Sequence, residues 1–381
     1  MGTDALGHVY ITGVFSRTIT IGSTTVTLPT NVNSVFTARL SAATGTIESL
    51  ASAFYYATST SPGTFDYFYP QLAVTPTGEM YILNTFNQSP LFSNTTLTSR
   101  GSNDVLIAKY NAQGNFEWAQ QFGGPSEENM RDGVVDAAGN LYVVGSFTGP
   151  ATFGNTTLSG AGNFDGCLVK YSPQGTMQWV QSVGGPNVDG LTSVSLDTSG
   201  NPYVTGYFTG TAQFGSATLT STGSRDIMVA AYTPQGQLRW AQQASGPGAD
   251  TGTYLGIDAT GEVYVHGLFT GSCNFGPLSI ANSATGYESF VARLGNHTFA
   301  TSARPTFSTG LYPNPATTSV HLPSVPVGNQ VQLLDAVGRI ARTTVVAPGG
   351  SVSLQGVTPG LYVVRATDAQ GHQVSGRLVV E

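Results

Sequence analysis

The stretch DAAGNLYVVGSF, at Asp136–Phe147, decides the fold because the chain repeats it at a fixed interval. Copies with the same pattern begin at Thr75, Asp197 and Asp258, each 61 residues from its neighbour. A fifth copy, DALGHVYITGVF, begins at Asp4. One tyrosine and the final phenylalanine keep their positions in all five copies. Such self-similarity at a fixed period is the sequence signature of a repeat architecture.

Each repeat reads as four strands. The turn D-x-x-G joins the first two, since glycine tolerates the positive φ of tight hairpins. The second strand, LYVVGSF in the copy above, is apolar on both faces and must be covered on both sides. Third strands are predicted at 105–110, 167–171 and 227–232. Sheets stacked around one axis cover each other's faces, so the predicted fold class is all-β, a β-propeller with about five four-stranded repeats visible.

The fourth strand carries a tryptophan at one repeat position, which indicates packing between blades rather than a ladder for stacking a ligand. These residues are Trp118, Trp179 and Trp240. The first repeat lacks most of its first strand and the last lacks a Trp-bearing fourth strand. A truncated N-terminus would explain this, as would closure by strands from the two ends.

Composition excludes several classes of function. Charged residues make up 9% of the chain and the net charge is −7, so no basic surface for nucleic acid is expected. No apolar run is long enough for a transmembrane segment. The two cysteines, Cys167 and Cys273, lie in different repeats and are interpreted as isolated buried thiols.

Acidic residues recur in register near the connections that we expect to be long loops, 148–165 and 123–132. Loops on a rigid scaffold often carry binding residues. Oxygen-rich clusters could hold calcium or another ligand, whereas the alternative is that each carboxylate caps its own loop through backbone N–H groups. The candidates are Asp104, Asp165, Asp226 and Glu288 at the starts of third strands, and Glu128, Asp189 and Asp250 before first strands.

No catalytic constellation is visible. The histidines share no metal-ligand spacing, and neither a nucleophile with a positioned base nor a Gly-rich phosphate loop is present. Paired carboxylates could serve a glycosidase or a lyase. These acids recur with the repeat, however, and an active site needs residues unique to one blade. The sequence therefore predicts no enzyme and no cofactor, with calcium left open.

The repeat ends near residue 298, so we place the propeller in 1–298, with repeats starting near 4, 75, 136, 197 and 258. Residues 299–310, rich in Ser, Thr and Pro, read as a linker. Short alternating strands with Gly and Pro turns follow in 311–381, which predicts a small immunoglobulin-like β-sandwich.

The repeats resemble the bacterial SBBP, or seven-bladed β-propeller, family. The shared pieces are D-x-x-G-N-x-Y-V-x-G-x-F, the later F-G pairs such as Phe153-Gly154, and the Trp-bearing strand. The resemblance covers about residues 4–297 and implies a propeller.

The C-terminal segment resembles the type A sorting domain of the type IX secretion system. Four motifs carry the likeness, namely Y-P-N-P, D-A-V-G-R, P-G-L-Y-V-V and a final G-R-L-V-V. The expected sorting signal comprises Tyr312, Pro313, Asn314, Pro315, Asp335, Gly338, Arg339, Gly360 and Tyr362.

That resemblance implies recognition by the secretion translocon, and attachment to surface lipopolysaccharide or release after cleavage. The route requires a signal peptide. The first residues, MGTDALGHVYITG, show none, so we expect one to be encoded upstream.

Together these observations predict a non-enzymatic secreted or cell-surface protein. It would bind glycan or protein through its long-loop face, in keeping with adhesion. Two alternatives stay open: a secreted carbohydrate-active enzyme, and a structural spacer within a larger adhesin.

Overall fold

The computed structural model describes the chain except for residues 31, 58–69, 88, 93–94, 259, 282–285, 296–297, 301–310, 324, 336–338 and 368–372. The chain divides into two compact units, 1–300 and 301–381. Most of the predicted linker, residues 301–310, lies outside the described residues. The secondary structure of the described part consists of β-strands and turns.

The repeat around Asp136 shows how each blade is built. Its strands are β13 (Glu128–Val135), β14 (Leu141–Phe147), β17 (Asp165–Tyr171) and β18 (Met177–Gly184), paired antiparallel in that order. Every position of β14 and β17 is buried, as expected for strands that are covered on both faces. We call this sheet blade 3.

The other four repeats form sheets of the same antiparallel order. Blade 1 comprises β1 (Gly2–Thr3), β2 (Val9–Ser16), β5 (Val32–Leu40) and β6 (Ile47–Ala57). Blade 2 comprises β7 (Gln71–Val74), β8 (Met80–Phe86), β11 (Asp104–Tyr110) and β12 (Phe116–Phe122). Blade 4 comprises β19 (Gly190–Leu196), β20 (Pro202–Phe208), β23 (Asp226–Tyr232) and β24 (Leu238–Ala244). Blade 5 comprises β25 (Thr251–Ile257), β26 (Val263–Phe269), β29 (Glu288–Gly295) and β30 (Thr298–Ala300).

Both end blades therefore have four strands. A two-residue β1 supplies the first strand of blade 1, and a three-residue β30 without tryptophan supplies the fourth strand of blade 5.

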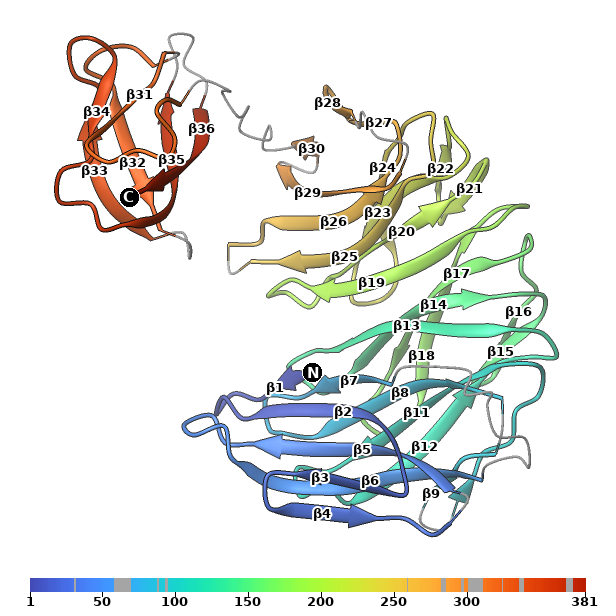
Figure 1. Ribbon diagram of the computed structural model, residues 1–381. Coiled ribbons are helices and arrows are strands. Elements are labelled where there is room, and N and C mark those ends of the chain that lie inside the picture. The colour runs from blue at the N-terminus through green and yellow to red at the C-terminus, as the bar shows by residue number, and fades with distance from the viewer. Residues whose placement is uncertain are drawn as a thin grey trace. The chain divides into compact units, whose positions relative to one another are not determined.

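Successive blades pack face to face, and their first strands lie side by side. Strand β13 contacts both β7 and β19, and β19 contacts β25. Figure 1 shows the five sheets following one another in chain order, from blue to yellow. Each apolar cluster of the first unit combines residues of two neighbouring blades; Tyr142 and Leu168 of blade 3, for example, pack with Val204 and Met228 of blade 4. This confirms the all-β propeller fold.

The connection between second and third strands is a β-hairpin, which corrects the prediction of a long loop. In blade 3, β15 (Ala151–Phe153) pairs with β16 (Thr156–Leu158) inside the predicted loop 148–165. Likewise β13 begins at Glu128, so the predicted loop 123–132 ends at residue 127. The other hairpins are β3 (Thr18–Ile21) with β4 (Thr24–Thr27), β9 (Leu91–Phe92) with β10 (Thr95–Thr96), β21 (Thr211–Phe214) with β22 (Ala217–Thr220), and β27 (Ser272–Phe275) with β28 (Leu278–Ala281).

Four hairpins attach to the outer strand of the preceding blade. Strand β21 pairs with β18 through Val183 and Phe214, and Gly123 and Thr152 form the corresponding bridge one blade earlier. The last residue of the first hairpin strand is a fully buried phenylalanine in each case; the four are Phe92, Phe153, Phe214 and Phe275. The hairpins thus extend each blade over its predecessor.

The second unit is a small immunoglobulin-like sandwich. One sheet has the order β33 (Ile340–Val345), β32 (Gln330–Leu334), β35 (Gly360–Thr367) and β36 (Gln373–Val380). The other pairs β31 (Ser319–His321) with β34 (Ser351–Ser353). Val320 and Val352 share one core with Val331, Val364 and Leu378.

Candidate functional site

The predicted acids lie at the junctions between blades, and six of them are fully buried. Each third-strand acid lies beside the acid that precedes the next blade. At the junction of blades 3 and 4, the N–H of Asp189 donates to the carbonyl of Phe164, the residue before Asp165 (2.9 Å). The same backbone bond joins Glu128 to Asn103 (2.9 Å) and Asp250 to Arg225 (2.8 Å). The resulting pairs are Asp104 with Glu128, Asp165 with Asp189, and Asp226 with Asp250.

The junction of blades 3 and 4 shows the geometry of a pair. Asp165 Oδ2 accepts the N–H groups of Ala161 (2.7 Å) and Gly162 (3.2 Å). Asp189 Oδ2 accepts the N–H of Gly185 (2.7 Å), and its Oδ1 accepts that of Thr209 (2.9 Å). The two carboxylates flank Gly184, where a Cβ would lie 2.2 Å from Asp165 Oδ1 and 3.0 Å from Asp189 Oδ2.

The other two junctions repeat this arrangement. Glu128 Oε2 accepts the N–H of Gly124 (2.7 Å), and Asp104 Oδ2 accepts that of Arg100 (3.0 Å). Asp226 Oδ2 accepts the N–H of Thr222 (2.8 Å), and Asp250 Oδ1 accepts that of Thr270 (3.2 Å). Each pair also holds at least one buried oxygen that has no hydrogen-bond partner among the described residues; these are Asp104 Oδ1, Glu128 Oε1, Asp165 Oδ1, Asp226 Oδ1 and Asp250 Oδ2.

Burial disfavours the charged form of these carboxylates. It raises the pKa of Glu128 from 4.5 to about 7, and the nearby charge of Asp104 adds to the effect. Burial likewise raises the pKa of Asp189 and of Asp250 to about 6, with Asp165 and Asp226 as the respective neighbouring charges. The pKa of each third-strand partner is raised as well, again chiefly by burial.

These contacts agree with loop capping, the second of the two interpretations of the sequence. A fully buried carboxylate that accepts backbone N–H groups is not available to an extracellular glycan or protein. Each pair supplies two carboxylates, fewer ligands than the six to eight oxygens that calcium takes. Among the described residues, no group of three or more His, Cys, Asp or Glu side chains could hold a metal ion. The seventh acid, Glu288, begins β29 of blade 5 and is partly buried.

The tryptophans and cysteines take the structural roles expected of them. The indole N–H of Trp118 donates to the carbonyl of Pro173 in the next blade (3.1 Å), and Trp179 does the same with Pro234 (3.0 Å). Both cysteines are buried free thiols. Burial raises the pKa of each thiol well above its usual range, so neither is an activated nucleophile.

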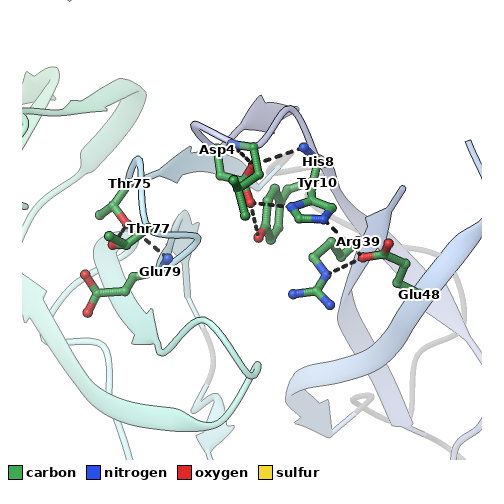
Figure 2. Close-up of polar contacts among 9 residues, drawn as sticks. Asp4, His8, Tyr10, Arg39, Glu48, Thr75, Thr77 and Glu79 are labelled. Atoms are coloured by element: carbon green, nitrogen blue, oxygen red, sulfur yellow. Dashed lines mark hydrogen bonds and ion pairs between the residues drawn. The ribbon is translucent and has the colours of Figure 1, made fainter. Parts of the chain in front are cut away.

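A polar cluster in blade 1 was not anticipated from the sequence (Figure 2). Asp4 Oδ2 lies 2.7 Å from His8 Nδ1 and accepts the Tyr10 hydroxyl (3.0 Å). Glu48 lies 3.7 Å from His8 Nε2 and 2.9 Å from Arg39 Nε. Burial opposes ionisation of Asp4, but bonds from His8 and Tyr10 outweigh it and lower the pKa of that carboxyl.

The blade 1 cluster occupies the first tight turn, where Asp4 also accepts the N–H groups of Leu6 and His8. In blade 2 the residue at this turn position is Thr75, whose Oγ1 accepts the N–H of Glu79 (3.0 Å; Figure 2). The cluster therefore stabilises a turn that every blade makes. Its two acids both contact its histidine.

The predicted sorting signal joins the two ends of the second unit. Asn314 Oδ1 accepts the N–H of Val379 (2.9 Å), and Ala316 exchanges backbone bonds with Val379 and Glu381 (2.8 and 3.0 Å). Tyr312 forms a backbone bridge with His321 and is 57% exposed. The peptide bonds preceding Pro313 and Pro315 are both cis.

The remaining signal residues close turns within the sandwich. Arg339 forms an ion pair with Asp335, with Nε and Nη2 each 2.9 Å from Oδ2. The Tyr362 hydroxyl donates to the carbonyl of Thr358 (2.8 Å), and Gly360 begins β35. Gly338 lies outside the described residues.

Residues 310–381 match the family of secretion system C-terminal sorting domains. The predicted sorting domain is therefore confirmed, and it points to a secreted or cell-surface protein. The match covers less than half of the chain and identifies this domain only. In the described part of the chain, no helix is long and apolar enough to cross a membrane.

One curated relative is similar to half of the chain. It is an uncharacterised WD repeat-containing protein of Acanthamoeba polyphaga mimivirus, 27% identical over 213 residues. The alignment covers 50% of this chain but spans only 15% of the relative's length. It hints at a propeller-like repeat protein, whereas membership of the SBBP family stays a prediction.

Solved structures align at low similarity. An ulvan lyase of polysaccharide lyase family PL25 is 11% identical, with a TM-score of 0.40 over 92% of this chain and 90% of its own. A GH43 protein from Bacillus licheniformis is 10% identical, with a TM-score of 0.30 over 97% of this chain and 83% of its own. Alignments this weak carry no argument about activity.

Proposed function

We propose that this chain is a non-enzymatic secreted or cell-surface protein, exported by the type IX secretion system, that binds glycan through the hairpins of its propeller. The observation that carries the binding proposal is a repeated set of solvent-facing threonine pairs on these hairpins. Such pairs are Thr18 with Thr27 (3.3 Å), Thr20 with Thr25 (3.0 Å), Thr152 with Thr157 (3.0 Å) and Thr211 with Thr220 (3.2 Å).

Paired hydroxyls suit a sugar because each both donates and accepts hydrogen bonds. The hairpins of blades 3 and 4, which carry the last two pairs, are held by the buried Phe153 and Phe214, so these hydroxyl groups are fixed before a ligand arrives. Buried acids support the absence of catalysis, since general acid–base chemistry needs a carboxyl within reach of the substrate.

Binding is tested on a glycan array with the full chain. We expect the double variant Thr211→Ala, Thr220→Ala to bind the selected glycan at least about 10-fold more weakly, since two surface hydrogen bonds are lost. The matched control is Thr44→Ala, Thr46→Ala, a hydroxyl pair (2.7 Å) on the tight turn between β5 and β6. Equal loss in both variants would contradict binding through the hairpin threonines, and no glycan bound at all would favour the spacer alternative. New reducing or unsaturated ends from a polysaccharide panel would establish an enzyme.

Export is tested in a bacterium that carries the type IX system, with a signal peptide placed before the chain. We expect the full chain outside the cell and a chain without residues 311–381 in the periplasm. The change should be close to complete because the matching domain is removed whole. Gln330→Ala, an exposed position on β32, is the control within the domain. Secretion of the shortened chain would contradict the proposal.

A further inference from the structure

Every internal junction of the propeller is made from the same positions. We call the side of a blade that faces the next blade its trailing face, and the opposite side its leading face. At the junction of blades 3 and 4, the trailing face contributes Tyr142, Val144 and Leu168, and all three are fully buried. The leading face of blade 4 contributes Val204, Met228 and Tyr232, which are 0–1% exposed.

The trailing face of blade 5 keeps the residue type of blade 4 at two central positions, a tyrosine on β26 and a valine on β29, but both lie open. Tyr264 is 38% exposed, whereas its counterpart Tyr203 in blade 4 is 5% exposed. Val291 is 61% exposed, whereas its counterpart Val229 is fully buried. On β25, Tyr254 is 69% exposed at the position where Ser193, 2% exposed, bonds to the next blade.

The leading face of blade 1, which is the other half of such a junction, is also exposed. Ile11, Phe36 and Leu40 occupy the positions of Val204, Met228 and Tyr232. All three are only partly buried, although their counterparts in blade 4 are covered by blade 3.

The hairpin of blade 1 likewise lacks a neighbouring blade. Strands β3 and β4 form a two-stranded sheet of their own, which makes no β-bridge to another sheet within the described part of the chain. Ile21 ends β3 where the other four hairpins have a fully buried phenylalanine, and it is only partly buried. The other hairpins attach to the outer strand of the preceding blade, so this hairpin would need the outer strand of a blade before blade 1.

We propose that the leading face of blade 1 docks onto the trailing face of blade 5 in a second copy of this chain, extending the blade-to-blade packing across two molecules. Continuity with the internal junctions carries the assignment, because each copy presents both halves of one repeated interface. The contact is head-to-tail, with different surfaces on the two partners. Such an interface either closes into a ring or grows into a filament.

The test measures the mass of the full chain by light scattering over a range of concentrations. We expect a dimer or larger assembly. Val291→Asp on the trailing face and Ile21→Asp on the first hairpin should each weaken association at least about 100-fold, since each places a charge in an apolar contact. Both positions are at least partly exposed, so circular dichroism should show folded variants. Thr156→Asp, at an exposed position of β16, is the control and should associate normally.

Mixing the two variants separates head-to-tail docking from a symmetric contact. The Val291→Asp chain keeps an intact leading face, and the Ile21→Asp chain keeps an intact trailing face. Their mixture should form a dimer through one unaltered junction. A monomeric chain at every concentration would overturn the proposal, and so would a mixture that stays monomeric while the parent chain associates.

Discussion

Replacing Phe153 by alanine is expected to lower the free energy of unfolding of the propeller by about 3–5 kcal/mol, the usual cost of truncating a fully buried aromatic side chain. The centroid of the Phe153 ring lies 4.8 Å from the ring centroid of Phe122 in the preceding blade. It lies 5.8 Å from the ring centroid of Phe147 in its own blade. The substitution therefore leaves a cavity at the junction of two blades. Chemical denaturation followed by tryptophan fluorescence measures the change.

The control for this substitution lies in the same hairpin. Thr156 is exposed at the start of β16, so Thr156→Ala should change the free energy of unfolding by less than about 0.5 kcal/mol. If the two variants lost equal stability, the hairpin would not be held by its phenylalanine.

Stability is expected to fall as the pH rises from about 5 to 8, with Glu128 making the largest contribution. Its pKa is raised from 4.5 to about 7 in the folded chain. The folded state therefore keeps a proton that the unfolded state loses over this range, and linkage makes the unfolding free energy decrease. The contribution is fully present below pH 4.5 and is lost as the pH passes 7, by about 3 kcal/mol for this group. Asp189 and Asp250, with pKa values of about 6, act in the same direction.

Glu128→Gln should flatten this pH dependence and exceed the parent chain in stability above pH 7. The amide oxygen can accept the N–H of Gly124, while the amide nitrogen can donate within the acid pair. Glu127→Gln removes the same charge from a partly exposed neighbour, which adds only a lesser share to the raised pKa of Glu128, and should flatten the pH dependence far less than Glu128→Gln does. If the stability of the parent chain rose from pH 5 to 8, the buried acids would not be protonated in the folded state.

Most of the fold could be predicted from the interval at which the sequence repeats. A tyrosine and a phenylalanine in fixed register located β14 and its counterparts, because these strands are buried on both faces and leave a continuous apolar signal. The expected third strands at 105–110, 167–171 and 227–232 match β11, β17 and β23 within two residues at each end.

The hairpins escaped prediction because their strands are short and polar. Segments such as ATFGNTTL, at Ala151–Leu158, alternate like strands, but their threonines and glycines are also typical of loops. The F-G pair was the available signal, since phenylalanine before a tight glycine turn indicates a hairpin with one buried position. Gly154 has a φ of 56°, as such a turn requires.

The acids were found in register, but their burial was not foreseen. From sequence alone, a carboxylate at the end of a strand is expected to be exposed, because the chain segment that covers it is not known. Asp189 is held at the junction because its N–H donates to the carbonyl of Phe164, 25 residues earlier in the preceding blade (2.9 Å). That contact depends on how one blade sits on the next, which the local sequence does not encode.

The bridging hairpins also bear on how the protein would respond to mechanical tension. Blades 1 to 4 are each held by a hairpin from the next blade, so the strands of one of these blades cannot separate before that hairpin detaches. Pulling on the chain would accordingly stretch it in discrete steps. Each step from blade 2 to blade 4 would release one repeat of 61 residues, a length of roughly 200 Å when fully extended.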